Sequence, residues 1–460
     1  MKRLKSEKGS VTVLVIVTLV FFMIVLTTAY LAASNTRVSQ LKETQRIKEI
    51  YEKDVENIES IYSSLLGEKF SDIYQSNTKY VDRDGKSVTI PKDFAVGVGS
   101  KINTVKNGLV ITDAVDINGN SIGNEFVWVP VENPVYNEII EMTTEEFNQK
   151  YTSPAKLNTV INSLKTTITT DGITPMAIKI KITDQPDVTK QYQYVSILYD
   201  FSETGVVPKT YSTAYREPDV LGNGSTDENT TYMSNFKDSS GRVATSREDV
   251  RDILQEEYTT MMKNIEREKG FWIGRYETSG TEKRVESKKE IIPATNSWYG
   301  LYTMQRDFAQ GKASIQSSMI AGSQWDAVLN WMYKDENAAI KTYVYDSTGC
   351  GWFPDNYSEN SSHLTGKEIV ENGVIKNAPK NIYDMAGNWS EWTLEASYDV
   401  NRVYRGGNYI NLSPVSKRVY NVPVGGNDYT SRLVLTTMPE IVKQDGSFDT
   451  AKGVNSPKIT

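Results

Sequence analysis

The 460-residue chain is poor in the side chains that hold transition metals or cross-link a fold. It contains one cysteine, Cys350, and one histidine, His363. A single cysteine cannot form a disulfide within the chain. A zinc site made of cysteine and histidine needs about four such ligands. Internal disulfides and zinc sites of this kind are therefore excluded.

An excess of positive charge is also missing. Lys and Arg number 51 against 58 Asp and Glu, which gives a formal net charge of −7. No segment forms a basic stripe, so nucleic acid is not an expected partner. The eight tryptophans all lie between Trp128 and Trp392. Large aromatic side chains belong in packed cores or binding faces, so we expect the globular part to be centred there.

The N-terminus has the pattern of a membrane anchor. Residues 1–8 carry four basic side chains and one acid, and residues 11–33 contain no charge over 23 positions. An apolar helix of this length spans about 34 Å, enough to cross a bilayer. Residues 1–33 are therefore predicted to be a basic leader and transmembrane helix. Because the positive flank stays inside, the bulk of the chain is expected to be extracytoplasmic, at the cell surface.

Beyond the membrane the helix is expected to continue as a stalk over residues 34–70. Apolar side chains recur there mostly three or four positions apart, from Val38 and Leu41 to Ile58 and Leu65. This spacing is typical of an amphipathic or coiled-coil helix. Gly67 is a suitable C-terminal cap.

The same N-terminus resembles that of a type IV prepilin. A basic leader ending at Gly9, an apolar helix and an amphipathic extension follow one another. Cleavage after Gly9 would leave Ser10 as the first residue, and other pilin-like subunits would then be partners. Type IV pilins usually carry glutamate at the fifth mature position, where this chain has Leu14. Both interpretations, an uncleaved anchor and a processed pilin-like helix, stay open.

Several motifs in the remaining sequence resemble the formylglycine-generating-enzyme (sulfatase-modifying factor) family. The matching segments are 124–131 (NEFVWVPV), 270–278 (GFWIGRYET), 319–332 (MIAGSQWDAVLNWM), 381–392 (NIYDMAGNWSEW) with 405–409 (RGGNY), and 431–435 (SRLVL). The resemblance implies an α+β fold of the C-type-lectin-like kind over residues 80–437. Residues 132–265 have no counterpart and are predicted to be an insertion. Residues 438–460 form a polar tail.

The chemistry of the family is not expected in this chain. Its oxidases hold copper through two cysteine thiolates just after the Arg-Gly-Gly turn, whereas residues 408–416 contain no sulfur. Other relatives bind iron through three histidines, and this sequence has one. Neither copper nor iron is expected, no catalytic residue is nominated, and a non-catalytic role is favoured over an enzymatic one.

A structural calcium ion is a further implication of the resemblance. In the family, the segment Gly-Asn-Val-Trp-Glu-Trp contributes oxygen ligands to calcium. Here it is Gly387-Asn-Trp-Ser-Glu-Trp392, so Asn388 and Glu391 occupy the matching positions. The alternative is that Asn388 closes its own turn and Glu391 forms local hydrogen bonds.

The segment after Arg405 has the composition of a recognition loop. Tyrosine supplies large amphipathic contacts, while Asn, Ser and Gly supply adaptable hydrogen bonds. The candidate ligand-binding residues are Asn408, Tyr409, Asn411, Tyr420, Asn421, Asn427 and Tyr429. The alternative is a solvated loop with ordinary turn residues.

Together these patterns favour a non-catalytic, surface-displayed binding or adhesion protein whose ligand is an extracellular protein or glycan. A minor or tip subunit of a type IV pilus-type filament is the first alternative. A sulfatase-modifying-type oxidase is the second.

Overall fold

The structure is a computed structural model that describes most of the chain. The described residues are 4–66, 68–212, 215–219, 236–238, 241–281, 284–345, 364–371, 374–375, 377–398, 401–408, 413–423 and 429–439, without the side chains of 4–13, 49–66, 284, 371 and 374. The chain divides into two compact units, Met1–Gly67 and Glu68–Thr460. Each unit is described by itself.

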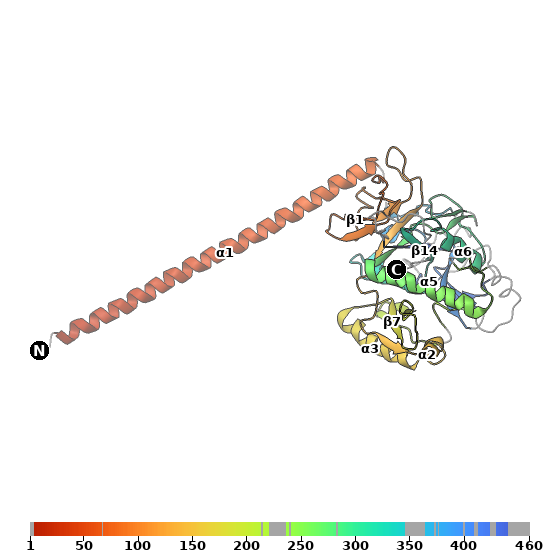
Figure 1. The fold of residues 1–460 in the computed structure, drawn as a ribbon. Helices are drawn as coiled ribbons and strands as arrows, with labels where there is room; N and C mark the ends of the chain where they lie inside the picture. The colour runs from red at the N-terminus through yellow and green to blue at the C-terminus, as the bar shows by residue number, and fades with distance from the viewer. Residues whose placement is uncertain are drawn as a thin grey trace, which may run out of the picture. The chain divides into compact units, whose positions relative to one another are not determined.

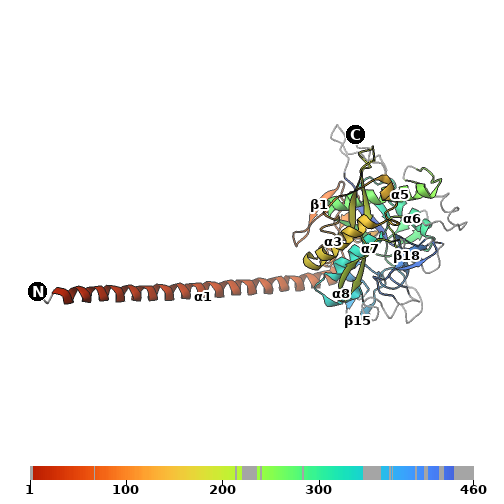
Figure 2. The same cartoon turned by 90° about the horizontal axis from the view of Figure 1, so that it is seen from below.

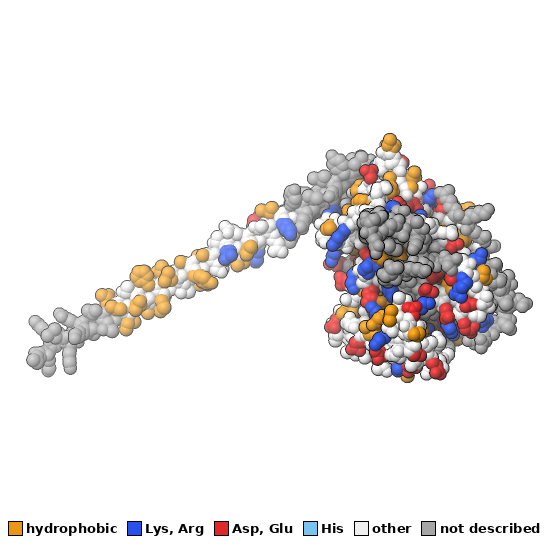
Figure 3. All heavy atoms as spheres, viewed as in Figure 1, with side chains coloured by type: hydrophobic (Ala, Val, Ile, Leu, Met, Phe, Trp, Pro, Cys, Tyr) orange, Lys and Arg blue, Asp and Glu red, His pale blue; other side chains and the backbone are white. Residues whose placement is uncertain are grey.

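The first unit is one helix, α1 (Leu4–Leu66), of 63 residues (Figure 2). Its stretch Leu14–Lys48 is long and apolar enough to cross a membrane. The most apolar part of this stretch has a mean hydropathy of 2.6, and none of it is buried. Figure 3 shows apolar side chains over the first part of this stretch and Lys and Arg side chains over its later part. An N-terminal helix compatible with a membrane anchor is thus confirmed. A signal sequence would satisfy the same criteria.

The second unit is built on a six-stranded sheet in the order β14-β21-β11-β5-β4-β3. All its pairings are antiparallel. The strands are β3 (Ala95–Val96), β4 (Val110–Thr112), β5 (Glu125–Pro130), β11 (Gly270–Gly274), β14 (Ile315–Met319) and β21 (Leu433–Thr437). The central strands are continuous apolar runs because both faces of the sheet are covered.

Three helices pack against this sheet and share its core. They are α5 (Arg247–Glu268), α6 (Trp298–Asp307) and α7 (Gly322–Tyr333). Ser246 caps α5 by accepting the backbone N–H of Asp249 at 3.1 Å, as its N-cap position predicts. Trp272, Trp298 and Trp325 are almost fully buried in this core. A shorter helix, α8 (Ala338–Tyr343), follows α7.

A second sheet carries the residues near the C-terminal motifs. Its order is β19-β18-β17-β20, with β17 (Ser390–Ser397), β18 (Asn401–Arg405), β19 (Val419–Asn421) and β20 (Tyr429–Ser431). Strands β17 and β20 pair in parallel, and the other two pairings are antiparallel. The 3-10 helix η1 (Pro379–Asn381) precedes β17.

The predicted insertion contains a smaller hydrophobic core of its own. It has a sheet in the order β6-β7-β8, from β6 (Ile140–Met142), β7 (Ala177–Ile182) and β8 (Tyr192–Ser196). Helices α2 (Thr144–Asn148) and α3 (Ala155–Asp171) belong to the same region. Along β7, Ile178, Ile180 and Ile182 are buried. In Figure 1 these elements lie on one side of α5, with β14 and α6 on the other.

The described part of the second unit also contains four hairpins. They are β1–β2 (Thr78–Val81, Ser87–Ile90), β9–β10 (Tyr199–Ser202, Gly205–Pro208), β12–β13 (Ser279–Thr281, Arg284–Glu286) and β15–β16 (Val370–Glu371, Val374–Ile375). In the first hairpin Asp82 accepts the backbone N–H groups of Asp84 and Lys86 at 3.0 and 2.7 Å. Asp82 therefore closes a turn.

The predicted mixture of helices and sheets is confirmed. The separate core of the insertion, however, extends only from Met142 to Tyr211. Helix α5 lies inside the predicted insertion of residues 132–265, yet its buried side chains join the main core. The apolar positions of α5 follow a helical period, which cannot tell which of two cores they face. Of the predicted tail 438–460, only residues 438–439 are described.

Candidate functional site

The two glycine-bearing turns predicted to form the site meet in space. The backbone N–H of Gly387 donates to the carbonyl of Gly406 at 2.9 Å, and Glu391 of β17 pairs with Arg405 of β18. Gly406 has a φ of +86°, and a Cβ there would lie 2.6 Å from the carbonyl oxygen of Met385. Only glycine fits this close approach without strain.

Glu391 forms a buried ion pair with Arg432. The guanidinium donates to both carboxylate oxygens, with Nε–Oε2 at 2.9 Å, and neither side chain is exposed. Arg432 also donates to the carbonyls of Gly274 and Tyr383 at 3.1 and 2.9 Å. Burial raises the pKa of Glu391, an effect that Arg432 opposes. The pair thus ties β17 to residues around the main sheet.

Asn388 contacts a second buried carboxylate, that of Glu277. Its Nδ2 donates to Glu277 Oε2 at 2.5 Å, and the backbone N–H of Trp389 donates to Oε1 at 3.0 Å. Burial raises the pKa of Glu277 well above its usual range, and the charges of Asp384 and Glu391 add to this. Burial and these neighbouring charges therefore favour the protonated form of Glu277. Neither Glu277 nor Asp384 was predicted as a site residue: Glu277 is 111 residues from Asn388 in the sequence, whereas Asp384 lies in the same loop as Asn388.

The loop before β17 has an unusual backbone. Lys380, Asn381, Asp384 and Asn388 all have φ between 52° and 63°. Asn and Asp tolerate this region better than most residues. Clustered positive φ values of this kind recur at ligand clamps and active sites. The conformation brings the carboxylates of Asp384 and Glu391 close enough to Glu277 to raise its pKa.

The predicted calcium ligands are thus engaged with protein groups. Both oxygens of Glu391 accept from Arg432, and Asn388 donates to Glu277. A calcium ion at these positions would have to compete with the guanidinium of Arg432. Among the described residues, no group of three or more His, Cys, Asp or Glu side chains is arranged to hold a metal. Calcium binding through Asn388 and Glu391 stays a prediction.

A second buried ionic network is centred on Arg405 of β18. Arg405 pairs with Asp326 at 2.8 Å and with Glu395 at 3.1 Å. Arg418 pairs with the same two carboxylates, with Nε 2.8 Å from Glu395 Oε2. Burial disfavours the charged guanidinium, but Asp326 and Glu395 outweigh this and raise the pKa of Arg418. The network joins α7 to β17 and β18, so Arg405 serves as a structural residue.

The N-terminus of α7 meets another buried acid, Glu217. Its carboxylate accepts the backbone N–H groups of Gly322 and Ser323, the latter at 2.9 Å, and the hydroxyl of Ser196 at 2.7 Å. Burial, with the charge of Glu395 adding to it, raises the pKa of Glu217 to about 7. A helix N-terminus favours a negative charge, yet burial dominates here.

The predicted ligand-binding residues are only partly described. Tyr409, Asn411 and Asn427 lie outside the described residues. Asn408 is buried. Asn421 donates to the hydroxyl of Tyr429 at 3.0 Å, and the Tyr429 ring stacks on Trp392 with centroids 4.9 Å apart. Cys350 and His363 also lie outside the described residues.

Tyr420 is exposed, and it has a neighbour that the sequence did not indicate. Its ring packs edge-on against Tyr398, with centroids 5.2 Å apart. The exposed fractions are 43% for Tyr420, 49% for Tyr398 and 39% for Val422. Tyr398 has a φ of +52°, a conformation that bulky residues rarely adopt. We call Tyr398, Tyr420 and Val422 the tyrosine face.

The processing positions Gly9 and Ser10 lie within α1, in a part of the helix whose side chains are not described. No protein-family model matches the chain, and no curated protein matches it. The candidate site therefore rests on the contacts given above.

Proposed function

We propose that this chain is a non-catalytic, surface-displayed binding or adhesion protein anchored by α1. The observation that carries the proposal is the stretch Leu14–Lys48 of α1. The most apolar part of this stretch contains no buried residue. Such a surface is unfavourable in water, and a bilayer would cover it. The globular unit that follows, from Glu68 onward, would then be displayed outside the cytoplasm.

We propose further that this globular unit has the formylglycine-generating-enzyme-like variant of the C-type-lectin-like fold. Support comes from where the resembling motifs fall. Strands β5, β11 and β21, which contain three of them, are neighbours in the main sheet. The two glycine-bearing turns are hydrogen-bonded to each other. Motifs far apart in the sequence thus converge, as parts of one fold should.

The tyrosine face is the proposed contact surface for an extracellular protein or glycan. Exposed aromatic side chains are enriched at binding interfaces, where they are among the strongest contributors to affinity. Tyr398 is held by its contact with Tyr420 and by a hydrogen bond from Arg216 to its carbonyl. A held aromatic side chain loses little entropy on binding.

A pilin-like subunit is the second candidate function. It is favoured by the continuity of α1 from Leu4 to Leu66, since an unbroken helix of this kind could pack into a filament after cleavage at Gly9. The sulfatase-modifying-type oxidase has no corresponding support, because residues 408–416 lack the cysteine pair.

The mature N-terminus separates the two candidates. We would measure it by mass spectrometry on protein released from cells by shearing and on protein extracted from membranes. A chain that begins at Met1 and stays in the membrane fraction is the expected result. A chain that begins at Ser10 and is recovered in filaments would replace the anchored receptor with the pilin-like subunit.

The contact surface is tested with the full chain in detergent on arrays of immobilised matrix proteins and glycans. We expect the Tyr398→Ala, Tyr420→Ala double variant to lose at least tenfold in binding. A control variant of the globular unit, Val188→Ala at an apolar side chain that is 72% exposed, should bind normally. Equal binding by both variants would remove the tyrosine face from the proposal.

A further inference from the structure

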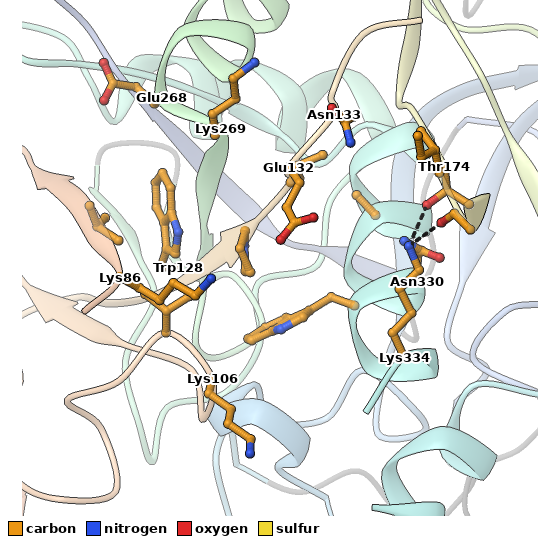
Figure 4. Close-up of a pocket in the computed structure, with 18 of the residues that line it drawn as sticks. Lys86, Lys106, Trp128, Glu132, Asn133, Thr174, Glu268, Lys269, Asn330 and Lys334 are labelled. Atoms are coloured by element: carbon orange, nitrogen blue, oxygen red, sulfur yellow. Dashed lines mark hydrogen bonds between the residues drawn. The ribbon is translucent and has the colours of Figure 1, made fainter. Parts of the chain in front are cut away.

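A cavity of about 720 Å³ lies away from the tyrosine face, next to the inserted core. It is lined by the β1–β2 turn, the end of β5, the residues after α3, the end of α5 and one side of α7 (Figure 4). This volume falls within the range of about 300–1,000 Å³ that is typical of small-molecule sites. The cavity uses residues from both the main core and the insertion.

The charges that line the cavity balance. Four lysines stand against four acids: Lys86, Lys106, Lys269 and Lys334 against Asp84, Glu132, Asp171 and Glu268. A site for a phosphate or another polyanion would carry an excess of positive charge, because binding sites complement the charge of their ligands. The lining therefore favours a ligand without net charge.

Polar groups in the cavity are available to a ligand. Within the described part of the chain, the ammonium of Lys86 and the carboxylate of Glu132 form no hydrogen bond or ion pair, and Figure 4 shows both turned into the cavity. Both side chains are exposed, so a ligand in the cavity can reach their charged groups.

The apolar part of the lining includes two indole rings, of which Trp128 is 3% exposed and Trp331 is the more accessible. Trp128 packs edge-on against Trp272, with ring centroids 4.9 Å apart. Trp331 is half-buried, and the ammonium of Lys380 lies 5.1 Å from its ring centroid. These contacts hold both rings in place before any ligand arrives. A fixed aromatic ring offers a flat apolar surface at low entropic cost.

We propose that this cavity binds a short neutral saccharide. A sugar ring presents an apolar face together with hydroxyl groups that both donate and accept hydrogen bonds. The cavity offers the complement: the indole ring of Trp331, an ammonium donor on Lys86, and carboxylate oxygen acceptors on Glu132. The volume suits two or three sugar rings. This site is separate from the tyrosine face and does not depend on it.

The test is a binding titration of the full chain in a detergent without a sugar head group. The probes are cellotriose, maltotriose and triacetylchitotriose, with trigalacturonate and trialanine as acidic and peptide comparisons. Tryptophan fluorescence and saturation-transfer NMR report binding. We expect at least one neutral trisaccharide to bind saturably, and neither comparison probe to compete with it.

Lys86→Met and Glu132→Gln should each weaken saccharide binding by about tenfold, since each removes a charged hydrogen-bonding group. Trp331→Ala should weaken it further. Lys79→Met on the same hairpin and Glu138→Gln beyond the cavity are matched controls at exposed positions, and both should bind normally. Because Lys86 and Glu132 form no described contacts through their charged groups, their variants should fold even if Trp331→Ala does not.

Three outcomes would overturn the inference. They are the absence of saturable binding by every neutral trisaccharide, wild-type affinity in both Lys86→Met and Glu132→Gln, and binding of the acidic or peptide probe alone. If the Tyr398→Ala, Tyr420→Ala variant loses saccharide binding while the cavity variants keep it, the proposed function stands and the cavity proposal fails.

Discussion

Glu391→Gln is predicted to destabilise the globular unit by about 3 kcal/mol. The substitution keeps the shape of the side chain but leaves Arg432 buried and charged without its carboxylate. Both side chains are fully buried, and removing one partner of a buried ion pair typically costs about 3–5 kcal/mol. The remaining amide oxygen can still accept one N–H, which places the expected value at the lower end.

Urea unfolding followed by tryptophan fluorescence measures this effect. All eight tryptophans lie between Trp128 and Trp392, so the signal reports the globular unit and not α1. The experiment uses the full chain in detergent with EDTA present. Arg432→Met is the reciprocal variant, and the double variant completes a thermodynamic cycle. We expect the free energy of unfolding to fall in the double variant by about 2 kcal/mol less than the two single losses added together.

The same experiment tests the calcium prediction. A ligand present at a hundredfold its dissociation constant stabilises the folded state by about 2.7 kcal/mol. If Glu391 binds calcium, the wild type should gain stability on calcium addition, and Glu391→Gln should lose that gain. A loss below about 1 kcal/mol for Glu391→Gln in EDTA would refute the ion-pair reasoning.

Two further predictions concern stability. The pKa of Glu217 rises from 4.5 to about 7 on folding. The contribution of Glu217 to stability is therefore fully present below pH 4.5 and is lost as the pH rises to about 7. A pKa shift of this size corresponds to about 3 kcal/mol. Glu217→Gln should flatten this part of the stability profile, measured from urea midpoints between pH 4.5 and 8, and an unchanged profile would contradict the assignment. Gly406→Ala should lower the free energy of unfolding by about 1–3 kcal/mol, since alanine is strained at this φ and its Cβ would approach Met385. The control is Gly311→Ala, because Gly311 has a similar φ of +80° but open space around it. An equal loss in both variants would show that the close approach to Met385 adds nothing.

Local sequence signals indicate individual elements. Ser246 and the acids that follow it have the pattern of a helix start, where α5 begins, and the apolar run 126–131 coincides closely with β5. These signals lie within a few residues of the element they define, so a single sequence carries them. The helix–sheet mixture and the N-terminal apolar helix were predictable for the same reason.

Pairings between distant residues were not predictable. Glu391 and Arg432 are 41 residues apart, and Asn388 and Glu277 are 111 apart. Periodicity indicates that a position is buried but not which partner it meets. Glu395, between the apolar residues Leu394 and Ala396 of β17, was one available signal, since a buried acid needs a partner. The exposure of Tyr398 had no sequence signal that we can identify.

The central claim, that the globular unit is displayed outside the cytoplasm, is tested most directly by cysteine labelling on intact cells. In a Cys350→Ser background, Ile117→Cys places one thiol at a position whose side chain is fully exposed. A membrane-impermeant maleimide should label it on intact cells, while a cytoplasmic protein with an exposed cysteine stays unlabelled. Labelling of Ile117→Cys only after the membrane is permeabilised would contradict the account.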